Sequence, residues 1–316
     1  MSELQMKATR VAYGETLASL AASDLDIVVL DADLSQSTMT AMFKKTCASR
    51  FVNTGIAEQN MMAVAGGLAA SGLTVFASTF AVFATGRAYD QIRQNIAHNR
   101  ANVKIVASHS GLTVGEDGAS HQALEDIALM RALPNMSVIC PADAVETASV
   151  IEAIARDDKP YYVRLGRPPV PIIFGDDYVY TPGKSNVLRE GTDVAVFATG
   201  HMVFRALRAH EMLKQEGISS EIVNVHTIKP LDEEAVVASA RKCGAVVTVE
   251  EHSIIGGLGS AICETLCEKQ PTRVVRLGVR DVFGESGTPD GLLEAHGLSA
   301  AHIAAQCKKV VSEKRQ

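Results

Sequence analysis

Several patterns that would assign a function directly are missing from this chain of 316 residues. Its six cysteines form no Cys-x-x-Cys pair, and no spacing typical of a zinc site occurs, so we expect no metal site built by this chain alone. A net charge of −6 argues against a nucleic-acid partner. No signal-peptide pattern opens the sequence, and the cysteines form no recognisable pairing pattern, so we expect a protein of the reducing cytoplasm.

Charge is also absent from residues 59–86, a run long enough to span a membrane. Glycines at 66, 67 and 72 interrupt this run, and alanine outweighs leucine in it, which favours a helix, a turn and a buried strand. We therefore expect no membrane association. A helix without charge must be covered on all sides, either by its own chain or by a partner.

Strand-like and helical stretches alternate through the first half of the sequence. We expect strands at 27–30, 51–52, 73–77, 103–107, 137–140 and 161–164, and helices at 8–23, 56–70, 81–97, 124–132 and 145–155. This alternation predicts a mostly parallel sheet flanked by helices.

A proline-rich segment, Gly166–Pro171, then interrupts the periodicity. A second alternation of strands and helices follows it. The predicted organisation is a first domain at 1–170, a linker at 171–188 and a second domain at 189–316, so the fold class is α/β with two consecutive domains. The turn at 256–259 lacks the G-x-G-x-x-G spacing, which favours a plain strand-to-helix connection over a dinucleotide loop.

Polar and glycine residues gather just after the strand expected at 103–107. In open α/β sheets, ligands bind beyond the carboxyl ends of the strands, although a plain polar surface loop explains the spacing equally well. From His109 to Gln122 the sequence reads His-x-Gly-x-x-x-Gly-Glu-Asp-Gly-x-x-His-Gln. This pattern resembles the substrate loop in the pyrimidine-binding domain of transketolases, which use thiamine diphosphate to move two-carbon units between sugar phosphates.

The segment Gly55-Ile56-Ala57-Glu58-Gln59 extends the resemblance. On the residues alone, Glu58 is a first-turn acid favoured by the helix dipole. The resemblance implies instead that Glu58 contacts the aminopyrimidine ring at N1′ and favours its imino tautomer, while the cofactor supplies the bond-making chemistry.

Aromatic residues follow at positions that line the pyrimidine pocket in this family. On their spacing alone, Phe80 and Phe83 are core residues, whereas the resemblance implies that Phe83, with Phe80 beside it, stacks on the pyrimidine ring. The sequence departs from the family at Gly86, where many members have a further aromatic residue. The run Arg87–Gln91 looks more like deoxyxylulose-phosphate synthases, and whether Tyr89 replaces the missing ring stays open.

The remaining site residues also come from the resemblance. It implies that Asp33 lies near the cofactor and that His121, Asp117 and His109 address the sugar hydroxyls and the reacting oxygen, although Glu116 is an equal candidate for the acid. It also implies a phosphate clamp, for which the guanidinium fork is well suited; its members are Arg10, Ser37, His109 and Arg167. A sulfonate or a branched sugar phosphate fits the same groups.

One part of a complete transketolase is not found in the sequence. The Gly-Asp-Gly segment and paired asparagines of the diphosphate-binding domain do not occur. The resemblance therefore implies a separate N-terminal subunit that binds the diphosphate and supplies most of the ligands of Mg²⁺. It also implies an α2β2 assembly, with the uncharged helix at the interface between subunits. The alternatives are a deoxyxylulose-phosphate synthase-like chain, the β subunit of a 2-oxo acid dehydrogenase, and a non-catalytic regulatory or metabolite-binding chain.

Overall fold

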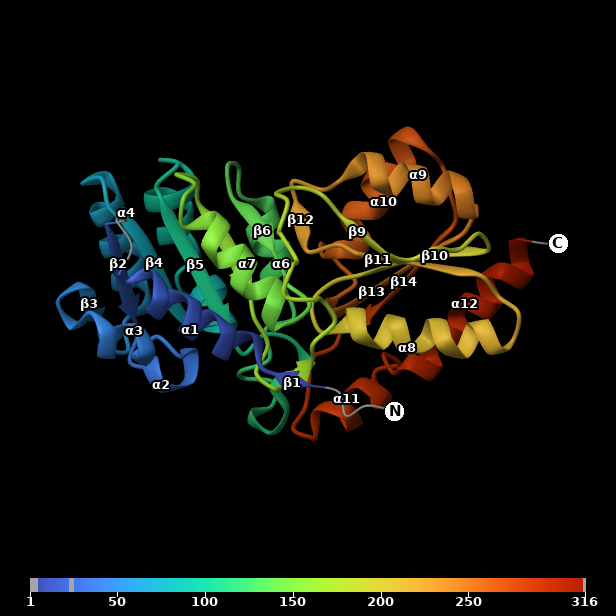
Figure 1. Cartoon of the computed structure of the whole chain (residues 1–316), viewed down its shortest axis with the longest axis horizontal. Coiled ribbons are helices and arrows are strands. Elements are labelled where there is room, and N and C mark those ends of the chain that lie inside the picture. Colours follow the sequence, from blue (N-terminus) through green and yellow to red (C-terminus); the bar gives the residue numbers. More distant parts are fainter. Residues whose placement is uncertain (1–4, 23–25, 315–316) are drawn as a thin grey trace.

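Two α/β domains lie side by side along the long axis of the molecule (Figure 1). The computed structural model describes residues 5–22 and 26–314. The strands of the first domain are β1 (Met6–Lys7), β2 (Ile27–Asp31), β3 (Phe51–Asn53), β4 (Thr74–Phe80), β5 (Val103–Ser108), β6 (Ser137–Ile139), β7 (Tyr161–Arg164) and β8 (Val170–Pro171). Its α-helices are α1 (Thr9–Leu20), α2 (Ser35–Thr38), α3 (Ala41–Thr46), α4 (Glu58–Ala70), α5 (Tyr89–Gln91), α6 (Asp126–Ala132) and α7 (Ala144–Ile154).

The main sheet of the first domain has the strand order β12-β6-β7-β5-β4-β2-β3. Every pairing within it is parallel except the one between β12 and β6. Its central strands β4 and β5 are buried along almost their whole length, which explains why they read as continuous apolar runs. The short strands β1 and β8 form a separate antiparallel pair.

Helices cover both faces of this sheet, and each face has its own core. On one face, α1 and α7 pack Tyr13, Leu17 and Val150 against the strands. On the other face, α4 contributes Met61 and Met62 to a core that continues into the second domain. The shared core makes the two domains one packed body rather than two independent units.

The second domain repeats the plan with a five-stranded sheet in the order β14-β13-β10-β11-β9. Its strands are β9 (Asn186–Arg189), β10 (Val194–Ala198), β11 (Ser220–Asn224), β13 (Val246–Ser253) and β14 (Val274–Val279), and β12 (Thr227–Lys229) crosses over to the first sheet. Its helices are α8 (Met202–Gln215), α9 (Glu233–Cys243), α10 (Leu258–Lys269), α11 (Pro289–Ala295) and α12 (Ala300–Lys314). Only β9 runs antiparallel to its neighbour in this sheet. The prediction of two α/β domains with mostly parallel sheets is therefore confirmed.

The segment after β4 differs from the sequence prediction. The strand expected at 73–77 continues to Phe80, because Ser78, Thr79 and Phe80 pair with β5. The single helix expected at 81–97 contains two π-helical stretches, η2 (Phe83–Arg87) and η3 (Ile92–Ala97). A π turn takes in an extra residue and changes which side chains share a face, an effect that hydrophobic periodicity cannot predict.

Helix α4, which carries no charge after Glu58, is only half covered in this chain. Its inner face is buried, and Gly66 lies so close to η3 that an added Cβ atom would be 2.7 Å from the carbonyl oxygen of Asn95. Its outer face, formed by Gln59, Asn60, Ala63, Val64 and Gly67, is exposed. The sequence requires α4 to be covered by its own chain or by a partner, and the chain itself covers only the inner half of the helix.

Candidate functional site

The candidate site lies at the carboxyl edge of the first sheet. Phe80 ends β4, His109 follows β5, and Arg167 lies in the segment that follows β7. These strands are parallel neighbours in the order β7-β5-β4, so their ends reach the same edge. This is the edge at which open α/β sheets bind ligands.

Four rings form a compact cluster at this edge. Phe80 stacks on His109 with ring centroids 3.8 Å apart, and on Phe83 at 5.9 Å. The ring of His121 meets Phe83 edge-on at 5.4 Å and Phe80 at 6.2 Å. Two predicted pocket residues and two predicted catalytic histidines thus come together, from three segments of the chain. Tyr89 instead packs against the main hydrophobic core.

Glu58 carries a buried carboxylate at the first residue of α4. Only 2% of its side chain is exposed, and both carboxylate oxygens lie 2.9 Å from one terminal nitrogen of Arg87. The same guanidinium lies over the ring of Phe83, at 4.7 Å from the ring centroid. Glu58 is therefore adjacent to the aromatic cluster, with Arg87 between them. Arg87 is not among the site residues predicted from the sequence, because its position depends on the π turn of η2.

The four predicted clamp residues lie near one another. The Arg10 side chain donates to the backbone carbonyls of Ser37 at 2.8 Å and Arg167 at 3.1 Å. Burial and the proximity of Arg167 lower the pKa of Arg10. Arg167 in turn donates to Glu116 at 2.9 Å. The loop acid that was an alternative to Asp117 is thus paired with a clamp arginine.

Burial lowers the pKa of His109 to about 3, and the nearby charges of Arg10 and Arg167 act in the same direction. Its Nδ1 atom lies 2.9 Å from the hydroxyl of Ser108. At neutral pH this imidazole is uncharged, so it can exchange a hydrogen bond with a ligand but adds no positive charge to the clamp.

The predicted acids differ in their surroundings. Asp117 is exposed, and its side chain makes no hydrogen bond or ion pair within residues 5–22 and 26–314. Asp33 is exposed, adopts a positive φ of 65° and accepts a hydrogen bond from Asn53 at 2.8 Å. The buried neighbour Asp31, which sequence analysis left without a role, accepts from the backbone of Leu34 and from the hydroxyls of two threonines. Asp31 therefore holds the segment that contains Asp33 and the short helix α2, on which Ser37 lies.

Hydrogen bonds from the second domain hold the segment that resembles the substrate loop, residues 109–122. Glu251 accepts hydrogen bonds from the backbone N–H and the hydroxyl of Thr113, at 3.0 and 2.8 Å. Gly111 has a positive φ of 74°, and a Cβ atom there would lie 2.4 Å from a Glu251 oxygen, so only glycine fits. The amide of Gln122 donates to the carbonyl of Glu285 at 3.0 Å. These long-range contacts have no signal in the local sequence.

Two further properties of the described chain bear on its function. None of the helices in residues 5–22 and 26–314 has the length and apolarity needed to cross a membrane. The same residues contain no group of three or more histidine, cysteine, aspartate or glutamate side chains arranged to hold a metal ion.

Comparison with known proteins assigns the family. The profile of the transketolase pyrimidine-binding domain matches residues 5–172, and that of the transketolase C-terminal domain matches residues 183–303. A protein of Methanocaldococcus jannaschii, provisionally named transketolase C-terminal section, is 50% identical over 98% of this chain and 97% of its own length. A 6-deoxy-6-sulfo-D-fructose transketolase subunit of Clostridium sp. (strain MSTE9) is 44% identical over 96% and 95%, respectively.

A solved structure agrees with these matches. A split-gene transketolase, described as an inactive β4 tetramer, is 52% identical with a TM-score of 0.91, over 97% of this chain and 99% of that one. The chain belongs to the transketolase family and carries its pyrimidine-binding and C-terminal domains, the part present in the split-gene members.

Proposed function

We propose that this chain is the C-terminal subunit of a cytoplasmic, thiamine-diphosphate-dependent transketolase. It transfers a two-carbon ketol unit from a ketose phosphate to an aldose phosphate, and it is active only with a separate diphosphate-binding subunit, as an α2β2 assembly. The observation that carries the proposal is the convergence of a buried carboxylate, stacked aromatic rings, two histidines and two arginines at one sheet edge. Transketolases as a family depend on thiamine diphosphate, which fits this set of groups.

The residues present fit the aminopyrimidine half of the cofactor. Glu58 offers a buried carboxylate for the ring nitrogen N1′, and Phe83 with Phe80 offers flat apolar surfaces for the ring face. Asp33 lies at the rim of the same edge. When bound, thiamine diphosphate supplies the nucleophilic carbon that accepts the two-carbon unit. The partner subunit supplies most of the coordination of Mg²⁺ and the diphosphate.

The substrate groups follow from the remaining side chains. Arg10 and Arg167 recognise the terminal anionic group, with Ser37 beside them and neutral His109 as a hydrogen-bonding member. His121 lies at the aromatic cluster, where its ring nitrogens can form a hydrogen bond with a sugar oxygen. Asp117 has an exposed side chain, which is available to a sugar hydroxyl.

The exposed half of α4 supports the need for a partner. It presents an uncharged face on which Val64 is exposed, and Ile56, just before the helix, is 79% exposed. Exposed apolar residues close together in this way are typical of an interaction site. We expect Val64→Arg on this face to prevent assembly, whereas Val179→Arg, at a valine that is exposed in the segment between the domains, leaves assembly intact. Size-exclusion chromatography with the partner distinguishes these outcomes.

The test of the proposed function is reconstitution. The chain is mixed with a candidate diphosphate-domain subunit, thiamine diphosphate and Mg²⁺, and offered xylulose 5-phosphate with ribose 5-phosphate. Two-carbon transfer only in the mixture supports the proposal. A panel with pyruvate and with a sulfonated ketose defines the substrate, since the clamp suits either anion. A pair that assembles but neither binds the cofactor nor transfers any two-carbon unit contradicts it and favours a non-catalytic role.

A further inference from the structure

Arg87 occupies the two surfaces that the proposed cofactor needs. One terminal nitrogen lies 2.9 Å from both oxygens of Glu58, so it faces the carboxylate symmetrically. The centre of the same guanidinium lies 4.7 Å from the centroid of Phe83. A pyrimidine ring that offers its edge to Glu58 and its face to Phe83 therefore meets Arg87 at both contacts.

The local backbone explains how Arg87 reaches this position. Phe83 and Arg87 are the first and last residues of the π turn η2. The exposed Gly86 lies just before Arg87, and a Cβ atom added to this glycine would meet no atom within 4 Å. Arg87 extends from the end of this turn to Glu58, at the start of α4.

The electrostatics of the pair are uneven. The Glu58 side chain is 2% exposed, whereas the Arg87 side chain is 49% exposed. An isolated buried carboxylate is costly, so the guanidinium stabilises Glu58 wherever no other partner is present. Because the Arg87 side chain is already half exposed, its guanidinium can move fully into water. The Glu58 carboxylate is buried at the start of α4 and has no such path. The arginine is the member of the pair that can move.

We propose that Arg87 is a gate on the pyrimidine pocket: its guanidinium and the aminopyrimidine ring exclude each other at Glu58 and Phe83. This inference rests on the proposed function and adds a device that closes the pocket until the cofactor displaces the arginine. A gate that is closed about nine-tenths of the time weakens the apparent affinity for the cofactor about tenfold. The gate also keeps the buried carboxylate neutralised while the pocket is closed.

Two other roles for Arg87 predict different results. If Arg87 held Glu58 in the orientation that the cofactor needs, its removal would weaken cofactor binding. If Arg87 only stabilised the fold, its removal would lower stability and leave cofactor affinity unchanged. Affinity therefore separates the three roles without any measurement of turnover.

The experiment compares variants of the full chain assembled with its partner subunit. Calorimetric titration with thiamine diphosphate and Mg²⁺ gives the dissociation constant for wild type, Arg87→Gln, Arg87→Lys and the control Arg208→Gln. Arg208 is an exposed arginine on α8, in the other domain. We expect Arg87→Gln to bind about tenfold more tightly than wild type, Arg87→Lys to be intermediate, and the control to match wild type.

A second measurement establishes the contact itself in the chain alone. The unfolding stabilities of wild type, Arg87→Gln, Glu58→Gln and the double variant form a double-mutant cycle, in which a gate that contacts Glu58 gives a non-additive result. Additive effects overturn the inference. Unchanged or weaker cofactor binding by Arg87→Gln, beside a wild-type pair that binds, overturns the gate alone. A wild-type pair that binds no cofactor instead overturns the proposed function, and the gate with it.

Discussion

The carboxyl ends of β4 and β5 in the first sheet border the ring cluster of Phe80 and His109, whereas the corresponding ends in the second sheet meet the first domain. After β10, Gly200 donates its backbone N–H to Cys140 at 3.2 Å. At the end of β13, Ser253 donates to Leu124 at 2.8 Å. Strand ends that can serve ligands in an open α/β sheet are here used to join two domains.

The glycine turn of the second domain is also occupied by groups of the chain itself rather than left open to a ligand. The turn at 256–259 leads into α10, whose N-terminal N–H groups attract negative charge. Glu250 fills that position from within the chain: its carboxylate accepts from Leu258 at 2.7 Å and from Gly259 at 2.8 Å. Glu250 therefore satisfies the helix start from within the chain, and the glycine turn contacts the first domain, where Arg131 donates to the carbonyl of Gly256.

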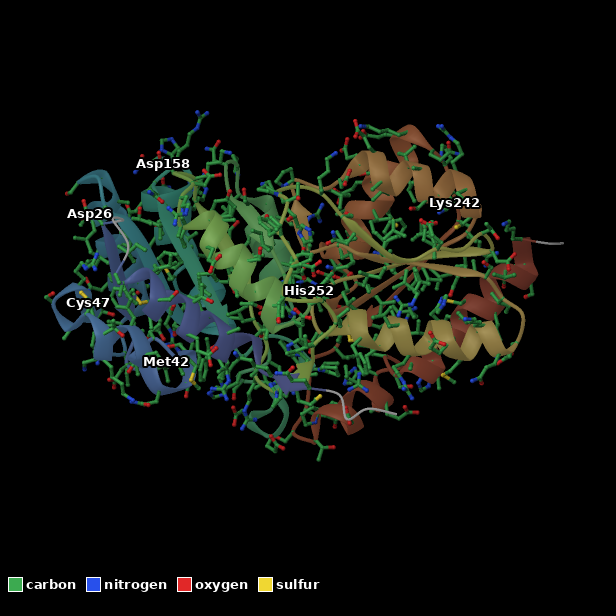
Figure 2. The ribbon with its side chains drawn as sticks, viewed as in Figure 1. Asp26, Met42, Cys47, Asp158, Lys242 and His252 are labelled. Atoms are coloured by element: carbon green, nitrogen blue, oxygen red, sulfur yellow. The ribbon has the colours of Figure 1, made fainter. Side chains whose placement is uncertain are left out.

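A buried ion pair completes this junction. Arg164, at the end of β7, donates to Asp126 at 2.8 Å and to the backbone carbonyl of Glu251 at 3.1 Å. His252 lies beside it between the two domains (Figure 2). The second domain thus acts as a support that fixes the ends of β6 and β7, and the ends of β4 and β5 stay available for chemistry.

Matched glutamate variants test this division most strongly. We expect Glu58→Gln to lower turnover of the reconstituted pair about a thousandfold, because an amide cannot share the proton of N1′, while the chain stays folded. Glu250→Gln should keep turnover but lose about 1–3 kcal/mol of stability, because one buried N–H loses its acceptor. Steady-state kinetics and urea unfolding measure the two effects. Comparable loss of turnover in both variants would contradict the separation of roles.

The junction itself is tested by breaking its ion pair. Asp126→Asn leaves the buried guanidinium of Arg164 without its ion-pair partner, and we expect a loss of about 3–5 kcal/mol in the free energy of unfolding. The control is Glu216→Gln, which removes the exposed partner of Lys308 and should cost less than about 1 kcal/mol. Similar small losses in both variants, by urea unfolding, would mean that the buried pair does not fix the junction.

The fold was largely predictable from local signals. Alternating apolar strands and helices, with Gly166–Pro171 between them, predicted two α/β domains, because buried parallel strands and amphipathic helices each leave a local pattern. The π turns after β4 were not predictable, since one added residue alters the helix geometry without altering composition. The crossover of β12 into the first sheet was also missed, because its pairing partner β6 is far away in the sequence.

The site was predictable where a motif carried it. Glu58, His109, His121 and the two phenylalanines come from short recognisable segments, and the structure brings them to one edge, although their catalytic roles stay predictions. Arg87 was missed because its significance depends on a contact with Glu58, which lies 29 positions earlier in the sequence. Local patterns can identify residues that resemble those of a known site. They do not identify residues such as Arg87, which pair with them only in the folded chain.

Variants of the phosphate clamp should change activity less than the variants above, and mainly with phosphorylated substrates. Arg167→Ala should weaken kcat/KM for phosphorylated sugars by about 10- to 100-fold, the value of one charge-assisted contact, and leave free sugars nearly unchanged. Glu116→Gln frees Arg167 from its ion pair, so we expect a modest gain for phosphorylated substrates. Equal losses for phosphorylated and free sugars would remove Arg167 from anion recognition.

The smallest effect concerns pH and the junction histidine His226. Its side chain is fully buried, and burial lowers its pKa to about 4 from an ordinary value of 6.5. Between these values the unfolded chain binds a proton that the folded chain excludes. The stabilising contribution of neutral His226 is therefore fully present above pH 6.5 and is lost as the pH falls toward 4.

Replacing this histidine should flatten the acid side of the stability curve. Between pH 7 and 5 we expect wild type to lose on the order of 2 kcal/mol more than His226→Gln, measured by urea unfolding at each pH. His98→Gln, at an exposed histidine of the first domain, should follow wild type throughout. Because buried acids such as Glu146, whose pKa is raised to about 7 by burial, act in the opposite direction, only the difference between variants isolates His226. If stability falls equally with pH in wild type and His226→Gln, protonation of His226 costs the folded state nothing. The junction would then be less rigid than its hydrogen bonds indicate.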